Sequence, residues 1–568
     1  MRKNLTLVIA LSGLMAVASC GAGPSGPAEP ETAAPSGYAY LLAVQDPALL
    51  VARIDAIVAD AGIEGLSWTV LGDLIASVSP YGNVAETAAA FGLRPDGTIL
   101  VFMNNMMAPN SFGVVFCVAD ETALRRGFEE VGLVLAEGEK LGDVATSSIA
   151  SPMGPIHMAV YRDLGLFAGT RTILEAMIAS VDQGGSGFSL PEGDALIYSA
   201  TDLSSIGPMI AAQLNQYRGL AMSSMEYDPT GMNSRMTGAF FDLVSLFLTE
   251  AGGVESWISF GPERVEIASS VEFVAGSSLR EFIVPCEGDD LSALLPAGET
   301  AAGRFRLDPA TTRELMTIVA DLFGFDVSTD MLDAVALMSS NTAVSMFAGE
   351  PGVSLLEVVA VYEVGDAMTL ESLKGLMNEY IALAEPLLES LPWMTVGTPG
   401  EVEHNGRTYV FYTTGFDLGS YLEAMPEVEA TPEEAEALRA LSMQFPVWMT
   451  IDDGLLWLEM ATEPGRIEAC LGQGVAAEES VADLEAMSTA LPGEEIAMAL
   501  NLPAYMASVM SFTPAEAGID LSGLSEIDSW LFYGLDFGEG SMAGRCVMDN
   551  DDLARAIGGF ATAFSGLD

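Results

Sequence analysis

This chain of 568 residues contains only two histidines, His157 and His404. A histidine can act as a general base or bind zinc, but a zinc site needs several ligands at short spacing. The sequence has no Cys-x-x-Cys or His-x-x-x-His spacing, no Gly-x-Ser-x-Gly elbow and no Gly-Lys phosphate loop. We therefore expect both histidines in turns or half-buried positions, and a Ser–His hydrolase only if the fold brings a serine beside one of them.

Two acidic clusters could gather calcium, because hard cations bind several oxygens from a short loop. They are Asp549–Asp552 and Glu287–Asp290. Neither has the Asp-x-Asp-x-Asp-Gly spacing with a distal Glu, and each precedes a predicted helix. Acidic residues at such places cap backbone amides, so we favour capping over calcium. A pair of glycosidase carboxylates cannot be chosen by spacing among 79 acidic residues.

Thioethers are numerous, with 30 methionines in the chain. Met222, Met225, Met232 and Met236 lie in one short stretch. Flexible methionines most often fill cores or loops, but they also line adaptable apolar grooves and can bind Cu(I). We take these four residues as possible contacts for an apolar ligand or a partner, and we predict no metal and no other cofactor.

Cysteine usage leaves two alternatives open. After Cys20 the chain contains Cys117, Cys286, Cys470 and Cys546. Outside the cytoplasm one disulfide in each half of the chain is arithmetically possible. The two pairs do not match in the repeat described below, and Cys117 lies in an apolar stretch where a buried thiol is ordinary. Bridges and free thiols are equally compatible with the sequence.

The first twenty residues have the composition of a secretion signal. Arg2 and Lys3 precede an apolar run, Leu5–Val17, that is shorter than the roughly 20 residues needed to span a bilayer. Val17-Ala-Ser-Cys20 then resembles the lipobox of bacterial lipoproteins. The resemblance implies cleavage before Cys20, a diacylglycerol on its sulfur and anchoring by several acyl chains. The alternative is a conventional cleavage site beside which Cys20 is a bystander.

These features predict where the protein works. Residues 1–19 would be a lipoprotein signal peptide and residues 20–37 a lipidated tether, disordered because its Gly, Ala, Pro, Ser and Glu cannot bury a core. The folded body would then be extracytoplasmic and lipid-anchored to a bacterial membrane, either inner or outer. No later stretch is long and apolar enough to suggest a spanning helix.

The composition indicates a folded and very acidic body. Half of the residues are hydrophobic, which is typical of a large buried core. The formal charge of −57 arises mainly from a shortage of bases, with only 22 Lys and Arg. Such a surface repels nucleic acid, so we predict no nucleic-acid partner. The acidic residues are spread along the chain, which favours a solubility adaptation over the steering of cations or basic partners.

An internal repeat divides the body. One pattern recurs four times: a proline, a few small residues, an apolar strand and then an Asp or Asn that begins a helix. Two further hairpin patterns each occur twice, in the same order in both halves of the chain. Tyr161–Phe167 resembles Ile451–Trp457, and Ser256-Trp257 resembles Ser529-Trp530. We predict two duplicated modules at 38–294 and 295–568. The predicted helix caps are Asp46, Asp202, Asp308 and Asn501, with Pro47 and Pro309 at first helical positions.

Hydrophobic periods within each module alternate between strand and helix. Gly113–Ala119 and Leu355–Tyr362 are predicted strands, and the apolar positions from Leu370 to Leu388 form one face of a predicted helix. Thr431 and Thr513 begin predicted capping boxes. Strand pairs joined by Gly and Asp indicate antiparallel sheet with amphipathic helices packed on one face. The predicted fold class is α+β.

The Leu-Pro-x-Gly segments before the strands and the Asp453–Trp457 turn resemble a bacterial domain-of-unknown-function family, numbered 3352, found in envelope and lipoprotein-like chains. This resemblance would cover most of residues 38–568 and implies no assigned reaction and no catalytic residues. We expect a non-catalytic protein that binds a partner or scaffolds an assembly in the cell envelope. The alternatives are a carrier of lipid or another apolar ligand and, less favoured, a hydrolase.

Overall fold

The computed structural model describes a large part of the chain, with gaps between the described segments. The described residues are 37–62, 88–106, 108, 110–151, 154–183, 195–224, 232–282, 290–296, 300–323, 327–349, 356–390, 393–417, 443–473, 487, 490–491, 495–510, 523–538 and 540–564. They form two compact units. The described residues of Met1–Ile210, Ala251–Glu272 and Met548–Gly558 form unit 1, and those of Ala211–Glu250, Phe273–Val547 and Gly559–Asp568 form unit 2.

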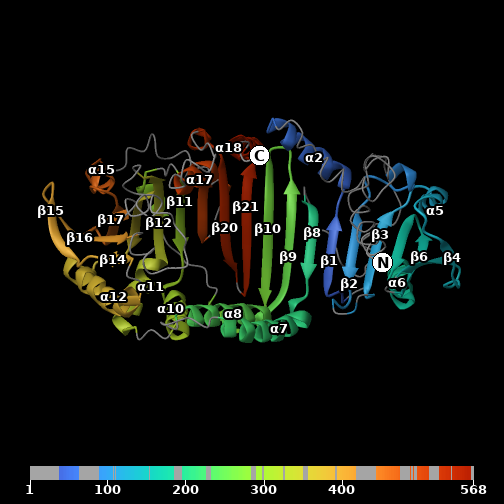
Figure 1. The fold of residues 1–568 in the computed structure, drawn as a ribbon, viewed down its shortest axis with the longest axis horizontal. Coiled ribbons are helices and arrows are strands. Elements are labelled where there is room, and N and C mark those ends of the chain that lie inside the picture. The colour runs from blue at the N-terminus through green and yellow to red at the C-terminus, as the bar shows by residue number, and fades with distance from the viewer. Residues whose placement is uncertain are drawn as a thin grey trace, which may run out of the picture. The chain divides into compact units, whose positions relative to one another are not determined.

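The sheet of unit 1 is antiparallel, and chain neighbours are only partly sheet neighbours (Figure 1). Its order is β4-β5-β6-β7-β3-β2-β1-β8-β9-β10, so the first strand β1 lies in the middle. The strands are β1 (Tyr40–Val44), β2 (Ile99–Met103), β3 (Phe112–Cys117), β4 (Leu135–Glu137), β5 (Thr146–Ser151), β6 (Gly154–Tyr161), β7 (Leu164–Ala168), β8 (Ala195–Thr201), β9 (Ala251–Phe260) and β10 (Arg264–Phe273).

The sheet of unit 2 repeats this order. From the edge formed by β14 and β15 it runs β16-β17-β18-β13-β12-β11-β19-β20-β21 (Figure 1). The strands are β11 (Ala301–Arg306), β12 (Asn341–Ala348), β13 (Leu356–Glu363), β14 (Met394–Val396), β15 (Gly400–His404), β16 (Arg407–Phe416), β17 (Met443–Asp452), β18 (Leu455–Met460), β19 (Ile496–Asn501), β20 (Trp530–Gly538) and β21 (Ser541–Asp549).

Helices follow the strands as the sequence predicts. The predicted helix from Leu370 to Leu388 is confirmed as α12. The helices are α2 (Pro47–Asp60), α5 (Glu121–Glu130), α6 (Arg171–Gln183), α7 (Leu203–Ser224), α8 (Met232–Glu250), α9 (Ser278–Phe282), α10 (Pro309–Phe323), α11 (Thr329–Ser340), α12 (Leu370–Ser390), α15 (Gly465–Gln473), α17 (Leu502–Met510) and α18 (Asn550–Phe564), with short 3-10 turns η2 (Leu291–Leu294) and η4 (Leu524–Glu526). The α+β class is confirmed.

All four predicted caps are confirmed. A side-chain oxygen of Asp46 accepts a hydrogen bond from the backbone N–H of Leu49 at 3.0 Å, three residues into its helix. Equivalent bonds to Asp202, Asp308 and Asn501 measure 3.1, 2.8 and 3.2 Å. Because such a bond satisfies an orphan amide of the first helical turn, each strand end fixes the start of the next helix.

One expectation about packing is wrong. Helices cover both faces of the sheet in each unit, not one: in unit 1, Leu174 of α6 packs in one core cluster and Phe128 of α5 in another. In unit 2, Ile467 of α15 and Leu373 of α12 likewise belong to different clusters. Alternate residues of a strand point to opposite faces of the sheet, and the central strands are apolar on both faces. Each face must therefore be covered by helices.

The two units share their register as well as their strand order. Leu164 of β7 lies opposite Cys117 and Tyr161, and Leu455 of β18 lies opposite Glu363 and Asp452. When residue pairs are counted across each sheet from these two hairpins, every residue of a central strand in unit 1 has an equivalent residue in unit 2. For example, β1 corresponds to β11. The predicted duplication and its module boundaries stay a prediction, which this common order supports.

None of the helices in the described part of the chain is both long and apolar enough to cross a bilayer. The predicted signal peptide, Cys20 and nearly all of the predicted tether lie outside the described residues, as do Thr431 and Thr513.

Candidate functional site

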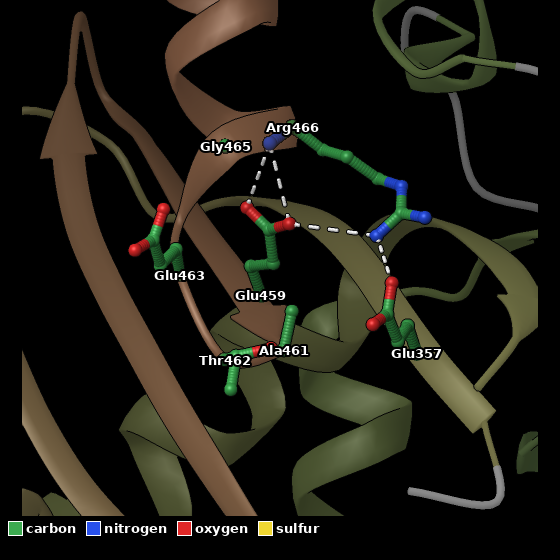
Figure 2. Close-up of a pocket in the computed structure, with 7 residues that line it drawn as sticks. All are labelled: Glu357, Glu459, Ala461, Thr462, Glu463, Gly465 and Arg466. Carbon is green, nitrogen blue, oxygen red and sulfur yellow. Dashed lines mark hydrogen bonds and ion pairs between the residues drawn. The ribbon is translucent and has the colours of Figure 1, made fainter. Parts of the chain in front are cut away.

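An open pocket of about 600 Å³ lies in unit 2, at the beginning of α15. β18 ends at Met460, a short turn follows, and α15 starts at Gly465, so the turn and the first helical residues form one wall. Figure 2 shows Glu357 of β13, Glu459 of β18 and Arg466 of α15 converging on this wall. The remaining lining residues are Ala461, Thr462, Glu463 and Gly465.

Glu459 is the most unusual of these residues because it is a carboxylate that is 1% exposed. The backbone N–H of Arg466 donates to its Oε2 at 3.1 Å and to its Oε1 at 3.2 Å. The N–H of Ile467 donates to Oε2 at 3.0 Å. A carboxylate from the preceding strand therefore caps α15 at the positive end of the helix dipole.

Burial dominates the titration of this group. Desolvation raises the pKa of Glu459 to about 7, although hydrogen bonds from the two backbone amides and the charge of Arg466 act in the opposite direction. A carboxyl with such a pKa changes its charge near neutral pH, whereas an ordinary glutamate is ionised there.

Arg466 connects the carboxylates that line the pocket. Its Nη1 forms an ion pair with Oε2 of Glu357 and lies 3.8 Å from Oε1 of Glu459. Its guanidinium also stacks on the ring of Phe347, with 4.0 Å between Cζ and the ring centroid. These contacts hold the arginine along the pocket wall (Figure 2). Glu463, which also lines the pocket, brings the number of carboxylates around the opening to three.

Unit 1 forms the same strand-to-helix junction without a buried acid. Ala168 occupies the register position of Glu459, four residues after the hairpin, and it is 0% exposed. There the side chain of Thr170 caps the helix, with its Oγ1 accepting from the N–H of Ile173 at 3.3 Å. The fold therefore does not need a buried carboxylate at this position.

The two histidines have different surroundings. His404 ends β15, where its Nδ1 lies 2.7 Å from Oε1 of Glu468 on α15. Hydrogen bonds from His404 and from Asn405 lower the pKa of Glu468. His157 lies within β6, and burial together with the charge of Arg171 lowers its pKa. Neither histidine lines the pocket at α15.

The four predicted methionine contacts lie outside the part of the chain whose side chains are described. Met225 lies outside the described residues, and the side chains of Met222 in α7 and of Met232 and Met236 in α8 are likewise not described.

In the described part of the two acidic clusters, a side-chain cap is present at Asp290. Asp551 and Asp552 lie in the first turn of α18. A side-chain oxygen of Asp290 accepts from the N–H of Ser292 at 3.0 Å, and its other oxygen pairs with Arg304 at 2.6 Å. Within the described segments, no group of three or more His, Cys, Asp or Glu could hold a metal ion.

The thiols of Cys470 and Cys546 are not bridged. Burial raises the pKa of Cys470 to about 11 and raises that of Cys546 as well. Cys117 is buried in β3, as predicted, and Cys286 lies outside the described residues.

The chemistry of the pocket differs from what the sequence suggested. Glu357, Glu459 and Arg466 were not singled out, because nothing in the sequence indicates which of 79 acidic residues meet. One signal was present: Leu455, Trp457 and Glu459 alternate along β18, so Glu459 continues an apolar row. When all three carboxylates are ionised, the pocket carries two more negative than positive charges, which favours a positively charged ligand.

No protein-family model and no curated protein matches the chain. Crystal form IV of TP0453 is a structural match, with 8% identity over 43% of this chain and 81% of that chain and a TM-score of 0.24. Crystal forms I and III match at 10% and 9% identity, over 44% of this chain and 80% and 82% of theirs, again with TM-scores of 0.24. At this TM-score the likeness establishes neither a shared fold nor a shared function. The resemblance to the domain-of-unknown-function 3352 family stays a prediction.

Proposed function

We propose that this protein is a non-catalytic binding protein of the cell envelope that holds an organic cation, an amine or guanidinium group, in the pocket at α15. The supporting observation is the buried carboxylate Glu459, placed beside Glu357 and Glu463 at an opening of about 600 Å³. Burying a charged group is costly, and the equivalent junction in unit 1 is completed by Ala168 and Thr170 instead.

A cation fits this pocket better than an anion does. The guanidinium of Arg466 already has two carboxylate partners, and a bound anion would lie beside three carboxylates. An alkylammonium or guanidinium group can instead donate hydrogen bonds to carboxylate oxygens, and such charge-assisted bonds are the stronger kind. The strong negative charge of the whole chain would draw such ligands toward the protein.

The envelope location belongs to the same proposal and depends on the lipobox resemblance. Lipid on Cys20 would anchor the body through the tether of residues 20–37, outside the cytoplasm, and the membrane would be its first partner. Mass spectrometry of the N-terminal peptide from native membranes tests this part. An unmodified Cys20, or a mature N-terminus elsewhere, would overturn it.

The binding part is tested by calorimetry with N-acetyl-L-arginine amide, whose only charge is a guanidinium. We expect the full-length protein to bind it at pH 8.5 in 150 mM NaCl, and Glu357→Gln to weaken binding about tenfold because one charge leaves the pocket. Glu379→Gln, an exposed change of equal charge on α12, is the matched control and should bind as the parent does. Equal weakening in both variants would indicate non-specific attraction and refute the site.

A carrier of an apolar ligand is the second candidate, and one observation favours it. Tyr217 of α7 and Phe240 and Leu243 of α8 are 63%, 63% and 50% exposed, and the Arg218–Asp242 ion pair joins the two helices. If these side chains form one contiguous apolar patch, that patch would serve as a contact surface for a lipid or a partner. Mass spectrometry of lipids and proteins that co-purify with the native protein tests this candidate: one stoichiometric lipid would support it.

A further inference from the structure

Loss of the negative charge of Glu459 would change the electrostatic interactions of the other groups in the pocket wall. Its carboxylate contacts the first two amides after Gly465 and the guanidinium of Arg466, which itself reaches Glu357. The side chain therefore takes part in both the start of α15 and the arrangement of charge in the pocket. The titratable or charged groups near it are Glu357 from β13, Tyr409 from β16, Glu463 from the turn, and Arg466 and Cys470 from α15.

Protonation of this carboxyl would change the electrostatics without removing the cap. A neutral carboxyl keeps one good acceptor, Oε2, which already receives both backbone N–H groups. The ionic attraction between Glu459 and Arg466 would be lost. Of the two carboxylates that now pair with Arg466, only Glu357 would still carry a negative charge. The pocket would keep three carboxyl groups, but its net charge would change from two negative charges to one.

We propose that Glu459 makes the pocket a pH-dependent cation site, which holds its ligand when the carboxyl is ionised and releases it when the carboxyl is protonated on acidification. This inference rests on the proposed function of the pocket. It explains why an acid is kept at a buried position that Ala168 fills in unit 1. Because burial raises the pKa of Glu459 to about 7, the change falls within a pH range that an envelope protein meets.

Linkage makes the proposal reciprocal. If a proton weakens cation binding, then a bound cation must lower the pKa of Glu459 by the corresponding amount and displace its proton. Binding near pH 7 should therefore release protons to the buffer. Calorimetry in two buffers of different ionisation enthalpy measures that release directly.

The test uses the full-length protein and N-acetyl-L-arginine amide, which keeps one positive charge between pH 5.5 and 8.5. We expect the affinity to fall about tenfold from pH 8.5 to pH 5.5, as one pocket charge is neutralised. Glu459→Gln, which is neutral at every pH, should bind weakly and equally at both values. Glu463→Gln, which removes an exposed pocket charge, should weaken binding but keep the pH dependence.

Each outcome separates the two proposals. No binding at pH 8.5 refutes the cation site itself. Binding of equal strength at both pH values, or pH dependence that persists in Glu459→Gln, refutes the inference and leaves the site intact. A ligand-free measurement covers the case of a variant that fails to fold: carbon-13 NMR titration of the parent protein should show the Glu459 carboxyl titrating near neutral pH, and a titration midpoint below pH 5 overturns the inference.

Discussion

The two units of this protein have one strand order and one register, but they fill the middle of the sheet differently. In unit 1, Ala43 of β1 is fully buried opposite Leu100 and Tyr198. Its counterpart in unit 2 is Arg304, whose side chain is only 6% exposed. A small residue among large ones has thus been exchanged for a large, charged one.

The neighbours of Arg304 make room for it. Ala343 and Ala497 lie directly opposite it on the adjacent strands, in place of the leucine and tyrosine of unit 1. Its Nη1 pairs with Asp290 at 2.6 Å, and its Nη2 donates to the carbonyl of Leu491 at 3.1 Å. The bulky side chain lies on the central strand in unit 2 and on its two neighbours in unit 1, so neither the size nor the polarity of a single position is shared.

A second pair of equivalent positions also differs in polarity. The backbone carbonyls of Leu196 and Glu495 accept equivalent bonds, from Gln45 and Arg306, and both residues are buried. Burial raises the pKa of Glu495, whose side chain accepts a hydrogen bond from the N–H of Phe537 at 3.0 Å. Together with Glu459, these replacements concentrate buried charge in unit 2, so chemistry that needs charge is expected there.

The largest effect is expected from Arg304→Ala. It would leave Asp290 without its cation, the carbonyl of Leu491 without its donor, and a cavity beside Ala343, so we expect about 3 kcal/mol less stability in urea unfolding. Adding Ala343→Leu should recover part of the loss by restoring the volume arrangement of unit 1. If the double variant is no more stable than the single one, a large side chain on β12 cannot replace the one lost from β11.

The features that could be predicted from sequence are the ones that local chemistry decides. Asp46 and Asn501 cap helices through bonds to residues only three positions away, and Pro47 begins its helix because proline suits the first turn. Such signals need no knowledge of the tertiary structure. The same local signals predict the internal repeat, since each copy of the pattern contains its own strand, cap and helix.

The candidate site depends on long-range pairing that no local pattern contains. Arg466 and Glu357 are 109 residues apart in sequence and meet only because β13 and β18 are neighbours. The burial of Glu459 depends on the helix that covers its face, and our expectation of helices on one face only was wrong. The sequence of β18 is apolar at both sets of alternate positions, which indicates a strand covered on both faces. That pattern predicts helices on both faces of the sheet and the burial of Glu459.

The next effect is the pH dependence of stability that Glu459 gives to unit 2. The pKa of Glu459 rises from 4.5 to about 7 on folding, so the folded protein binds the proton more tightly than the unfolded chain does. The resulting stabilisation is complete below pH 4.5 and is lost as the pH rises to about 7, by about 3 kcal/mol. We therefore expect the free energy of unfolding of the parent to fall relative to Glu459→Gln across this range.

Urea unfolding at pH 5 and at pH 8 measures this difference. The relevant quantity is the change in the gap between parent and variant from pH 5 to pH 8, because any effect of the substitution that does not depend on pH cancels in it. Glu379→Gln provides the baseline for an exposed acid. A gap that is the same at pH 5 and pH 8 would show that Glu459 titrates as an ordinary glutamate despite its burial.

The smallest effect concerns the two ways of capping equivalent helices. In unit 1 the cap of α6 is Thr170, so Thr170→Ala should cost about 1 kcal/mol or less, given the long bond to Ile173. Thr462, in the turn before α15, should tolerate alanine at almost no cost, because Glu459 caps that helix from the strand. Hydrogen exchange of the first-turn amides distinguishes the two: protection should fall in α6 and stay unchanged in α15. Equal loss in both helices would mean that α15 relies on its turn as α6 does, and the buried carboxylate would then have no capping role to set the two units apart.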